Sequence, residues 1–125
     1  MNNIRPGPAN AGFTLVEIMI VVAIIGMLAS IAIPNFVRAR KDANKNACIC
    51  NLRQIEGAVQ EFALSHHKEG AEPISYSDIS DYLRGRVVCP SGGTTFNDSY
   101  QVTSVESRPV CLRSTEGEFA HRLTL

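Results

Sequence analysis

One carboxylate, Glu17, lies inside an otherwise uncharged apolar run that extends from Phe13 to Ile33. A charged side chain at membrane depth costs about 2.5–3.5 kcal/mol on insertion scales, so such groups are usually paired. No Lys, Arg or His lies within two helical turns of Glu17, so its partner must come from elsewhere. Cutting the chain after Gly12 would create an α-amine on Phe13, on the same helix face as Glu17. The alternative is a carboxylate that is solvated at the level of the lipid headgroups.

The cysteines are the second set of residues that could do chemistry: Cys48, Cys50, Cys89 and Cys111. Four cysteines allow three complete disulfide pairings, and such bonds persist outside the cytoplasm. Cys48 and Cys50 point to nearly opposite sides of a helix, so they cannot easily pair with each other. Together with His66 and His67 they could suggest zinc, but this spacing separates the thiols, so no metal site is predicted. We expect Cys48 to be buried on an apolar helix face and Cys50 to be a free thiol.

The remaining polar residues indicate neither an enzyme nor a nucleic-acid binder. The sequence contains no nucleophile motif, no glycine-rich phosphate loop and no clustered pair of catalytic acids. Lys and Arg are scattered and the formal net charge is zero, so nucleic acid is not an expected partner. The acidic residues near expected C-terminal loops are candidates for calcium: Asp98, Glu106, Glu116 and Glu118. Their spacing matches no calcium loop, so we expect no cofactor, with calcium in this region as the alternative.

The apolar run 13–33 predicts a transmembrane helix. Its 21 residues would span about 31 Å as a helix, close to the thickness of a hydrocarbon core. The run is too long for a typical signal-peptide h-region, and no small-x-small cleavage site follows it. The alternative is a buried helix of a soluble protein, but 125 residues could hardly cover a helix that is apolar on all sides. By the positive-inside rule alone, the basic residues after the run would place the C-terminal part in the cytoplasm.

A second helical segment, 34–65, is expected to continue the first. Pro34 falls inside the helical pattern and predicts a kink; the alternative is that the helix ends at Ile33. Apolar residues then recur on one face, and we call them the apolar stripe: Cys48, Leu52, Ile55, Val59 and Phe62. One kinked helix is therefore predicted from about residue 13 to about residue 65, and its apolar stripe needs a cover.

Residues 66–125 are expected to supply that cover as a small head. A short helix is predicted at 78–83, starting near Ser75 or Ser77 and stopping at Gly85. A turn is predicted at 91–93, and strands at 100–105, at 109–113 and in the alternating tail 119–125. About 60 residues alone bury too little surface to be stable, but on the apolar stripe they can form one core. The predicted fold class is α+β, with a small antiparallel sheet packed on the C-terminal half of a long helix.

The stretch GFTLVEIMIVVAIIGMLA, residues 12–29, closely resembles the N-terminal signature of type IV prepilins and type II secretion pseudopilins. The resemblance continues through Ile-Pro-Asn-Phe and the following helix to about residue 64, which is roughly half of the chain. It implies a pilin-like fold with a leader, 1–12, and a prepilin peptidase that cuts between Gly12 and Phe13 and methylates the new amine. Glu17 would then neutralise the terminal amine of a neighbouring subunit during filament assembly.

The same resemblance implies a single-pass precursor in the inner membrane. The leader, with Arg5 as its only charged side chain, would stay in the cytoplasm, so 34–125 would lie outside, against the charge rule. The implied partners are other copies or related pilins, the prepilin peptidase, an inner-membrane assembly platform, and membrane lipid before assembly. The final location would be a cell-surface or periplasmic filament, with stems that bend near Pro34.

A disulfide between Cys89 and Cys111 is predicted in the head. These two residues bracket 21 others that contain the predicted turn and a strand. A bond between them would close a loop worth about 3 kcal/mol in the chain-entropy model. The pattern Cys-Pro-x-Gly-Gly followed by a later Cys also resembles the heads of some bacterial pilin-like proteins.

Three functions stay open from the sequence. The first is a structural subunit of a type IV pilus-like filament, and the second is a pseudopilin of a type II secretion system. The third is a membrane-anchored binding module that does not polymerise, which predicts no cleavage at Gly12 and tolerance of Glu17→Ala. A filament subunit predicts instead that Glu17→Ala leaves the protein in the membrane and blocks assembly.

Overall fold

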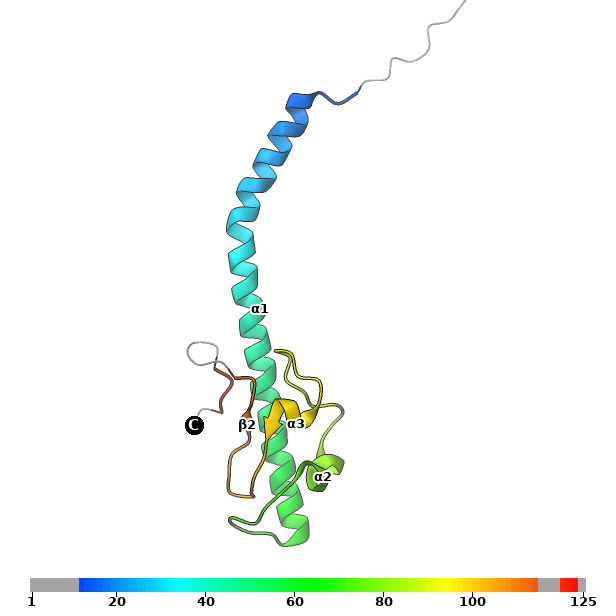
Figure 1. Cartoon of the computed structure of the whole chain (residues 1–125), viewed down its shortest axis with the longest axis vertical. Coiled ribbons are helices and arrows are strands. Elements are labelled where there is room, and N and C mark those ends of the chain that lie inside the picture. Colours follow the sequence, from blue (N-terminus) through cyan, green and yellow to red (C-terminus); the bar gives the residue numbers. More distant parts are fainter. Residues whose placement is uncertain (1–11, 115–119, 124–125) are drawn as a thin grey trace, which may run out of the picture. The chain divides into compact units, whose positions relative to one another are not determined.

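The computed structural model describes residues 12–114 and 120–123. In chain order the elements are α1 (Leu15–His66), α2 (Tyr76–Ile79), the 3-10 helix η1 (Ser80–Tyr82), α3 (Phe96–Ser99), β1 (Tyr100–Gln101) and β2 (Val110–Cys111) (Figure 1). The contacts divide the chain into two units, with the boundary after Val37. The first unit contains the N-terminal part of α1. The second contains the rest of α1 and the segments that follow α1, and we call these following segments the head.

α1 is one helix of 52 residues, and it continues through Pro34. The predicted helix 13–65 is therefore confirmed, and the alternative of a helix end at Ile33 is wrong. The kink at Pro34 stays a prediction. The helix ends at His66 because His67 adopts a left-handed backbone conformation with φ of 52°. The backbone N–H of Lys68 donates to the carbonyl of Ala63 at 2.9 Å and so caps the C-terminal end of the helix.

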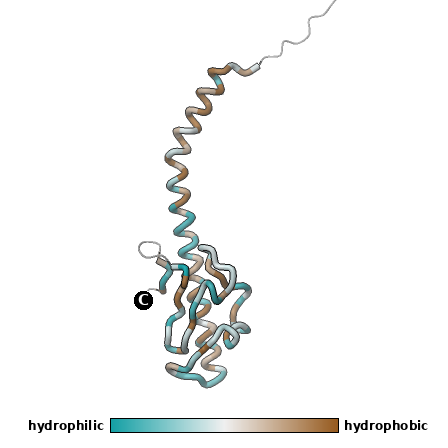
Figure 2. Tube along the Cα trace, viewed as in Figure 1, coloured by the Kyte–Doolittle hydropathy of each residue, from teal (hydrophilic) through white to brown (hydrophobic). Residues whose placement is uncertain are grey.

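The N-terminal part of α1 is apolar on all sides and exposed. Every large apolar side chain between Phe13 and Val37 is exposed, from 47% at Val37 to 86% at Phe13, and Figure 2 shows this part of the helix as predominantly hydrophobic. By length and composition this stretch can cross a membrane, and none of it is buried within the structure. It fits a membrane-anchored precursor, as predicted from the sequence.

The apolar stripe forms the floor of the head's core, as predicted. All five of its residues are buried, with Cys48, Leu52 and Ile55 fully inaccessible. Seven buried residues from the segments after α1 cover the stripe: Ile74, Ile79, Val87, Cys89, Phe96, Tyr100 and Cys111. The head alone would bury too little apolar surface to be stable. Packed on the apolar face of α1, it shares one core with the helix.

The head contains a short antiparallel sheet, and the predicted α+β fold class is confirmed. Tyr100 of β1 pairs with Cys111 of β2, and Gln101 pairs with Val110. Both strands have two residues, fewer than predicted, because the chain after β1 bonds to the segment 70–74 instead of β2. An isolated bridge between Pro73 and Ser104 marks this second pairing.

The predicted tail strand is wrong where the structure describes it, because 120–123 have no strand conformation. Phe119 and Leu125, which belonged to the same prediction, lie outside the described residues. The leader 1–12 also lies outside them except for Gly12. Residues 91 and 92 form a turn, as predicted for 91–93, with Gly92 at φ of 111°.

Two short helices begin with reciprocal caps. The predicted helix at 78–83 is present as α2 and η1, and the N-terminal cap of α2 is Ser75. The backbone N–H of Ser75 donates to Asp78 at 2.8 Å. α3 was not predicted, although Thr95-x-x-Asp98 has the spacing of a capping box.

Candidate functional site

The first turn of α1 is built around Glu17 and Thr14. The backbone N–H and the hydroxyl of Thr14 donate to the Glu17 carboxylate at 2.8 and 2.6 Å. The N–H of Glu17 donates back to the Thr14 hydroxyl oxygen at 3.3 Å. This is the capping-box arrangement, in which a Thr at the N-terminal cap and a Glu three residues later satisfy otherwise unpaired backbone N–H groups.

The hydrogen-bond partner of Glu17 is thus local, and the inference that it must come from elsewhere is wrong in this respect. The signal Thr-x-x-Glu was present in the sequence and would have found it. Thr14 is neutral, however, and leaves the negative charge of Glu17 without a counter-charge in this turn. The α-amine of Phe13, proposed from the sequence, stays a prediction as the group that supplies it.

The Gly12–Phe13 peptide bond lies ahead of α1 and outside any helix. Both residues are exposed, Phe13 by 86%. A Cβ added at Gly12 would meet no atom within 4 Å. The bond at which cleavage is predicted is therefore accessible, in a segment whose backbone is free of helical hydrogen bonds.

Comparison with known proteins identifies this N-terminal region. Residues 8–33 match the family model described as the prokaryotic N-terminal methylation motif. The chain is 48% identical over 79 residues to the type IV major pilin protein PilA of Myxococcus xanthus, covering 63% of this chain and 33% of that protein. It is 39% identical over 56 residues to type II secretion system core protein G of Escherichia coli, covering 45% and 39%.

A third relative decides the family. The chain is 36% identical over 83 residues to the competence protein ComGC of Bacillus subtilis, covering 65% of this chain and 82% of that protein. The chain belongs to the type IV pilin-like family. It spans 33% of the Myxococcus pilin and 39% of the E. coli secretion protein, so those relatives are longer proteins. No solved structure matches the chain.

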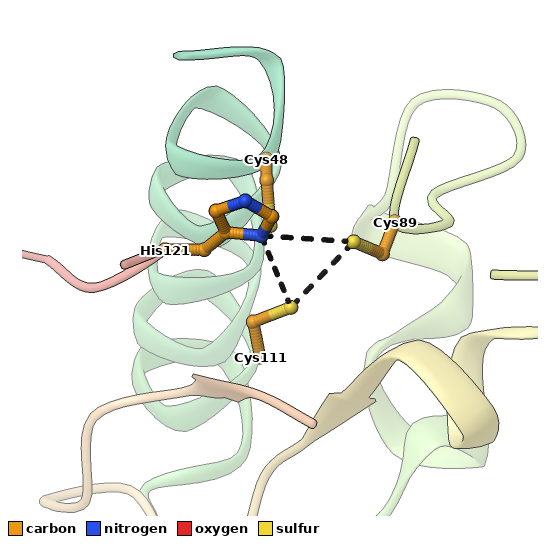
Figure 3. A group of neighbouring side chains, drawn as sticks. All are labelled: Cys48, Cys89, Cys111 and His121. Atoms are coloured by element: carbon orange, nitrogen blue, oxygen red, sulfur yellow. Dashed lines mark hydrogen bonds between the residues drawn. The ribbon is translucent and has the colours of Figure 1, made fainter. Parts of the chain in front are cut away.

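In this pilin-like chain the head brings together three cysteines and one histidine (Figure 3). Cys48 lies on α1, Cys89 before the turn at 91–92, Cys111 on β2, and His121 in the C-terminal segment. The Sγ atoms of Cys89 and Cys111 lie 3.6 Å apart. The Nδ1 atom of His121 lies 3.9 Å from Cys89 Sγ and 3.8 Å from Cys111 Sγ. We call these four residues the thiol–imidazole cluster.

The cluster lies among buried side chains of the head. Its residues are buried, with His121 exposed by 4% and Cys111 by 8%. Burial raises the pKa of the Cys48 and Cys111 thiols. Burial, and next the positive charge of Lys45, lowers the pKa of His121.

A series of hydrogen bonds through Tyr100 and Asn51 links Cys48 to neighbouring segments. The hydroxyl of Tyr100 donates to Cys48 Sγ at 3.5 Å. The side-chain amide of Asn51 donates to the same hydroxyl oxygen at 3.0 Å and to the carbonyl of Val88 at 2.9 Å. One turn of α1 is thereby connected to β1 and to the segment that carries Cys89.

The structure leaves the predicted disulfide untested. Cys89 and Cys111 face each other as predicted, but they are free thiols here. Cys48 is buried and Cys50 is exposed, as their helical spacing indicated. His66 stacks on Phe62, with ring centroids 4.4 Å apart, and is not among the cluster residues.

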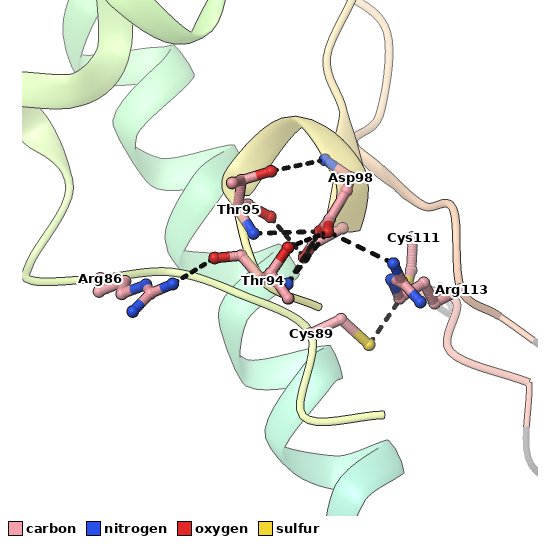
Figure 4. A network of polar contacts seen from close by, with 8 residues as sticks. Arg86, Cys89, Thr94, Thr95, Asp98, Cys111 and Arg113 are labelled. Atoms are coloured by element: carbon pink, nitrogen blue, oxygen red, sulfur yellow. Dashed lines mark hydrogen bonds and ion pairs between the residues drawn. The ribbon is translucent and has the colours of Figure 1, made fainter. Parts of the chain in front are cut away.

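Asp98 is the most heavily hydrogen-bonded acid that the structure describes in the head (Figure 4). Its carboxylate accepts bonds from the Thr94 hydroxyl at 2.6 Å and from the N–H of Thr95 at 3.2 Å. Arg113 forms an ion pair with it at 3.3 Å. Hydrogen bonding, first from Thr94, holds the pKa of Asp98 well below its ordinary value. Asp98 thus caps α3. The calcium alternative stays untested, because Glu116 and Glu118 lie outside the described residues.

Proposed function

We propose that this chain is the structural subunit of a type IV pilus-like filament. In this proposal the chain is made as a membrane-anchored precursor, cut between Gly12 and Phe13, and methylated on the new amine of Phe13. The supporting observation is that the methylation motif at 8–33 coincides with the exposed, uniformly apolar part of α1 and places Glu17 in its first turn.

The physical requirement behind this proposal is that the N-terminal part of α1 must be covered. Roughly 25 cal/mol is lost for each Å² of apolar surface left in water, so an exposed helix of this length cannot remain in solution alone. Membrane lipid covers it before assembly, and the same segments of other subunits cover it in the filament. Removal of the leader requires the prepilin peptidase, and transfer from the membrane into the filament requires an inner-membrane assembly platform.

Glu17 has two separable roles in this scheme. Its oxygens cap the first turn of α1 by accepting from Thr14. Its charge, which Thr14 does not neutralise, is available for the α-amine of a neighbouring subunit once the leader is removed. Transfer of an unpaired carboxylate into an apolar helix bundle is costly, and transfer of a paired one is much less so.

A pseudopilin is the second candidate, because relatives of the chain include type II secretion core protein G. A pseudopilin uses the same processing and the same helix, and it differs in forming a short periplasmic filament instead of a surface pilus. The membrane-anchored binding module stays the third account. It requires neither cleavage nor a charge at Glu17.

The test compares Thr14→Val with Glu17→Gln in cells that express the chain. Thr14→Val removes the cap and keeps the charge, and loss of such a cap costs about 1 kcal/mol, so we expect most of the filament to persist. Glu17→Gln keeps an acceptor that works in a capping box but removes the charge. We expect it to be cut and retained in the membrane but absent from filaments. Normal filament levels in Glu17→Gln would refute the assigned role of the charge.

The readout is mass spectrometry of the peptide Phe13–Arg38 from sheared surface material and from the cell envelope. The methylated peptide in the sheared fraction supports a surface pilus, and its confinement to the envelope supports the pseudopilin. A peptide that continues through Gly12 in both fractions supports the binding module and overturns the filament proposal.

A further inference from the structure

We propose that the thiol–imidazole cluster of the head binds one Zn²⁺ ion as a structural site, with Cys48, Cys89, Cys111 and His121 as its ligands. One ligand atom from each of the four residues lies within 4.8 Å of every other. The ligands come from α1, a loop, β2 and the C-terminal segment, so the ion would join parts of the chain that are far apart in sequence (Figure 3). This proposal does not depend on the proposed filament function.

The distances are those of a tetrahedral zinc site. With Zn–S bonds of about 2.3 Å and Zn–N bonds of about 2.0 Å, tetrahedral angles place two sulfurs roughly 3.8 Å apart and a sulfur and a nitrogen roughly 3.5 Å apart. The Sγ atoms of Cys89 and Cys111 are 3.6 Å apart, and both lie within 4 Å of His121 Nδ1, at 3.9 and 3.8 Å. For these three ligand atoms the displacements that an ion requires are a few tenths of an ångström, and Cys48 Sγ lies within 4.8 Å of each of them.

The donor set and the burial favour zinc in a structural role. Three thiolates and one imidazole are a common structural zinc set, and such sites are four-coordinate with no open position. All four residues are buried, and together they supply the four donors of a tetrahedral shell. Thiolate-rich sites discriminate against magnesium and calcium, which prefer oxygen ligands. Binding replaces the thiol protons, so up to three protons leave for each ion bound.

Groups around the cluster provide a hydrogen-bond donor to a ligand sulfur and hold the imidazole in place. Thiolate ligands are held by hydrogen-bond donors in the surrounding shell. The Tyr100 hydroxyl donates to Cys48 Sγ at 3.5 Å. The N–H of His121 donates to the Ser114 hydroxyl oxygen at 2.9 Å and fixes the segment that carries the imidazole. These contacts orient the ligands before any ion arrives.

The competing arrangement is the Cys89–Cys111 disulfide expected from the sequence. The two are mutually exclusive, because oxidised sulfurs no longer act as thiolates. A disulfide uses two of the four groups and leaves the Cys48 thiol and the His121 imidazole beside it as buried side chains. The metal uses all four, and this is why the geometry favours zinc.

The test uses the full chain, purified in detergent without reductant from cells grown with zinc. Metal content is measured by mass spectrometry, and thiols are counted by alkylation after unfolding with a chelator. We expect about one zinc per chain and four alkylated cysteines. Replacement of zinc by Co²⁺ should give the strong visible absorption of a tetrahedral thiolate site. Cys50→Ser is the matched control, because Cys50 is an exposed cysteine two residues from Cys48.

Cys50→Ser should keep the full zinc content, whereas His121→Ala and Cys111→Ser should lose it. Tyr100→Phe keeps every ligand and removes the hydroxyl that donates to Cys48 Sγ and accepts from Asn51, so it should weaken zinc binding by about 10-fold, as expected for an outer partner. The wild-type measurement alone can overturn the proposal, whatever the variants do to folding. A chain two hydrogens lighter with Cys89 and Cys111 cross-linked, four free thiols that take up no zinc, or another metal in the site would each refute it.

Discussion

Leu52→Ala tests whether the apolar stripe of α1 is the floor of the head's core. Leu52 is fully buried in the middle of the stripe, between Cys48 and Ile55. Substitutions of this kind cost about 2–5 kcal/mol, and the loss is larger where the site cannot collapse. The helix backbone on one side and the core residues of the head on the other limit collapse, so we expect a loss of about 3 kcal/mol. A small unit with a total of about 5–15 kcal/mol would be visibly weakened.

Leu64→Ala is the matched control, because it makes the same change on the same helix. Leu64 is 78% exposed, so its loss should change stability by no more than about 0.5 kcal/mol. The assay is urea unfolding of the monomer in detergent, at fixed free zinc, followed by tyrosine fluorescence. All three tyrosines of the chain lie in the head, and there is no tryptophan. Equal losses in the two variants, or a loss below about 1 kcal/mol for Leu52→Ala, would refute the assigned core.

Two further predictions concern the loop and the cap next to the cluster. Gly93→Ala should destabilise the head by at least about 1–3 kcal/mol, since a Cβ would overlap Ser99 Oγ and lie 2.8 Å from the backbone N of Cys89; the same urea titration measures this, and a wild-type midpoint would contradict it. The lowered pKa of Asp98 means that the folded state binds its proton less readily than the unfolded state. The resulting stabilisation is present above the ordinary Asp pKa of about 3.9 and is lost as pH falls below it. Asp98→Asn should therefore flatten the acid limb of stability against pH, which urea titrations at a series of pH values measure, and an unchanged acid limb would contradict the assigned role.

The parts of the fold that periodicity controls could be predicted from the sequence. α1 and the apolar stripe follow from a long apolar run and from a 3.6-residue repeat, which depend on local spacing alone. The two strands of the head are antiparallel, as predicted, but each is shorter than predicted. Its strands end after two residues because the chain beyond Gln101 finds partners at 70–74, a choice that depends on tertiary contacts.

Some local features were missed although the sequence contained their signals. Thr14-x-x-Glu17 and Thr95-x-x-Asp98 both have the spacing of a capping box, and both form one. In the first, the charge of Glu17 suggests a cationic partner, whereas its hydrogen-bond partner Thr14 is neutral. A carboxylate at the start of a helix has a second use, which is to accept from backbone N–H groups.

The thiol–imidazole cluster could not be predicted from spacing, because its four ligands come from four segments. Spacing in the sequence directs attention instead to Cys48-x-Cys50 with His66 and His67, where the thiols diverge, and to the pair Cys89 and Cys111. The alternating pattern of the tail predicts a strand at His121, which the structure does not contain at 120–123. Only the folding of the head on α1 brings the imidazole against the three sulfurs.

The weakness of the regular structure in the head explains why such a cluster would be useful there. After α1, the described elements are helices of three or four residues and strands of two, so few ladder bonds hold the head together. Small units of this kind usually need a covalent or metal cross-link. A Cys89–Cys111 disulfide would join two segments of the head to each other. Zinc would also fasten both to α1 through Cys48 and to the C-terminal segment through His121. A head held by zinc should loosen with a chelator, whereas a head held by a disulfide should loosen with a reductant.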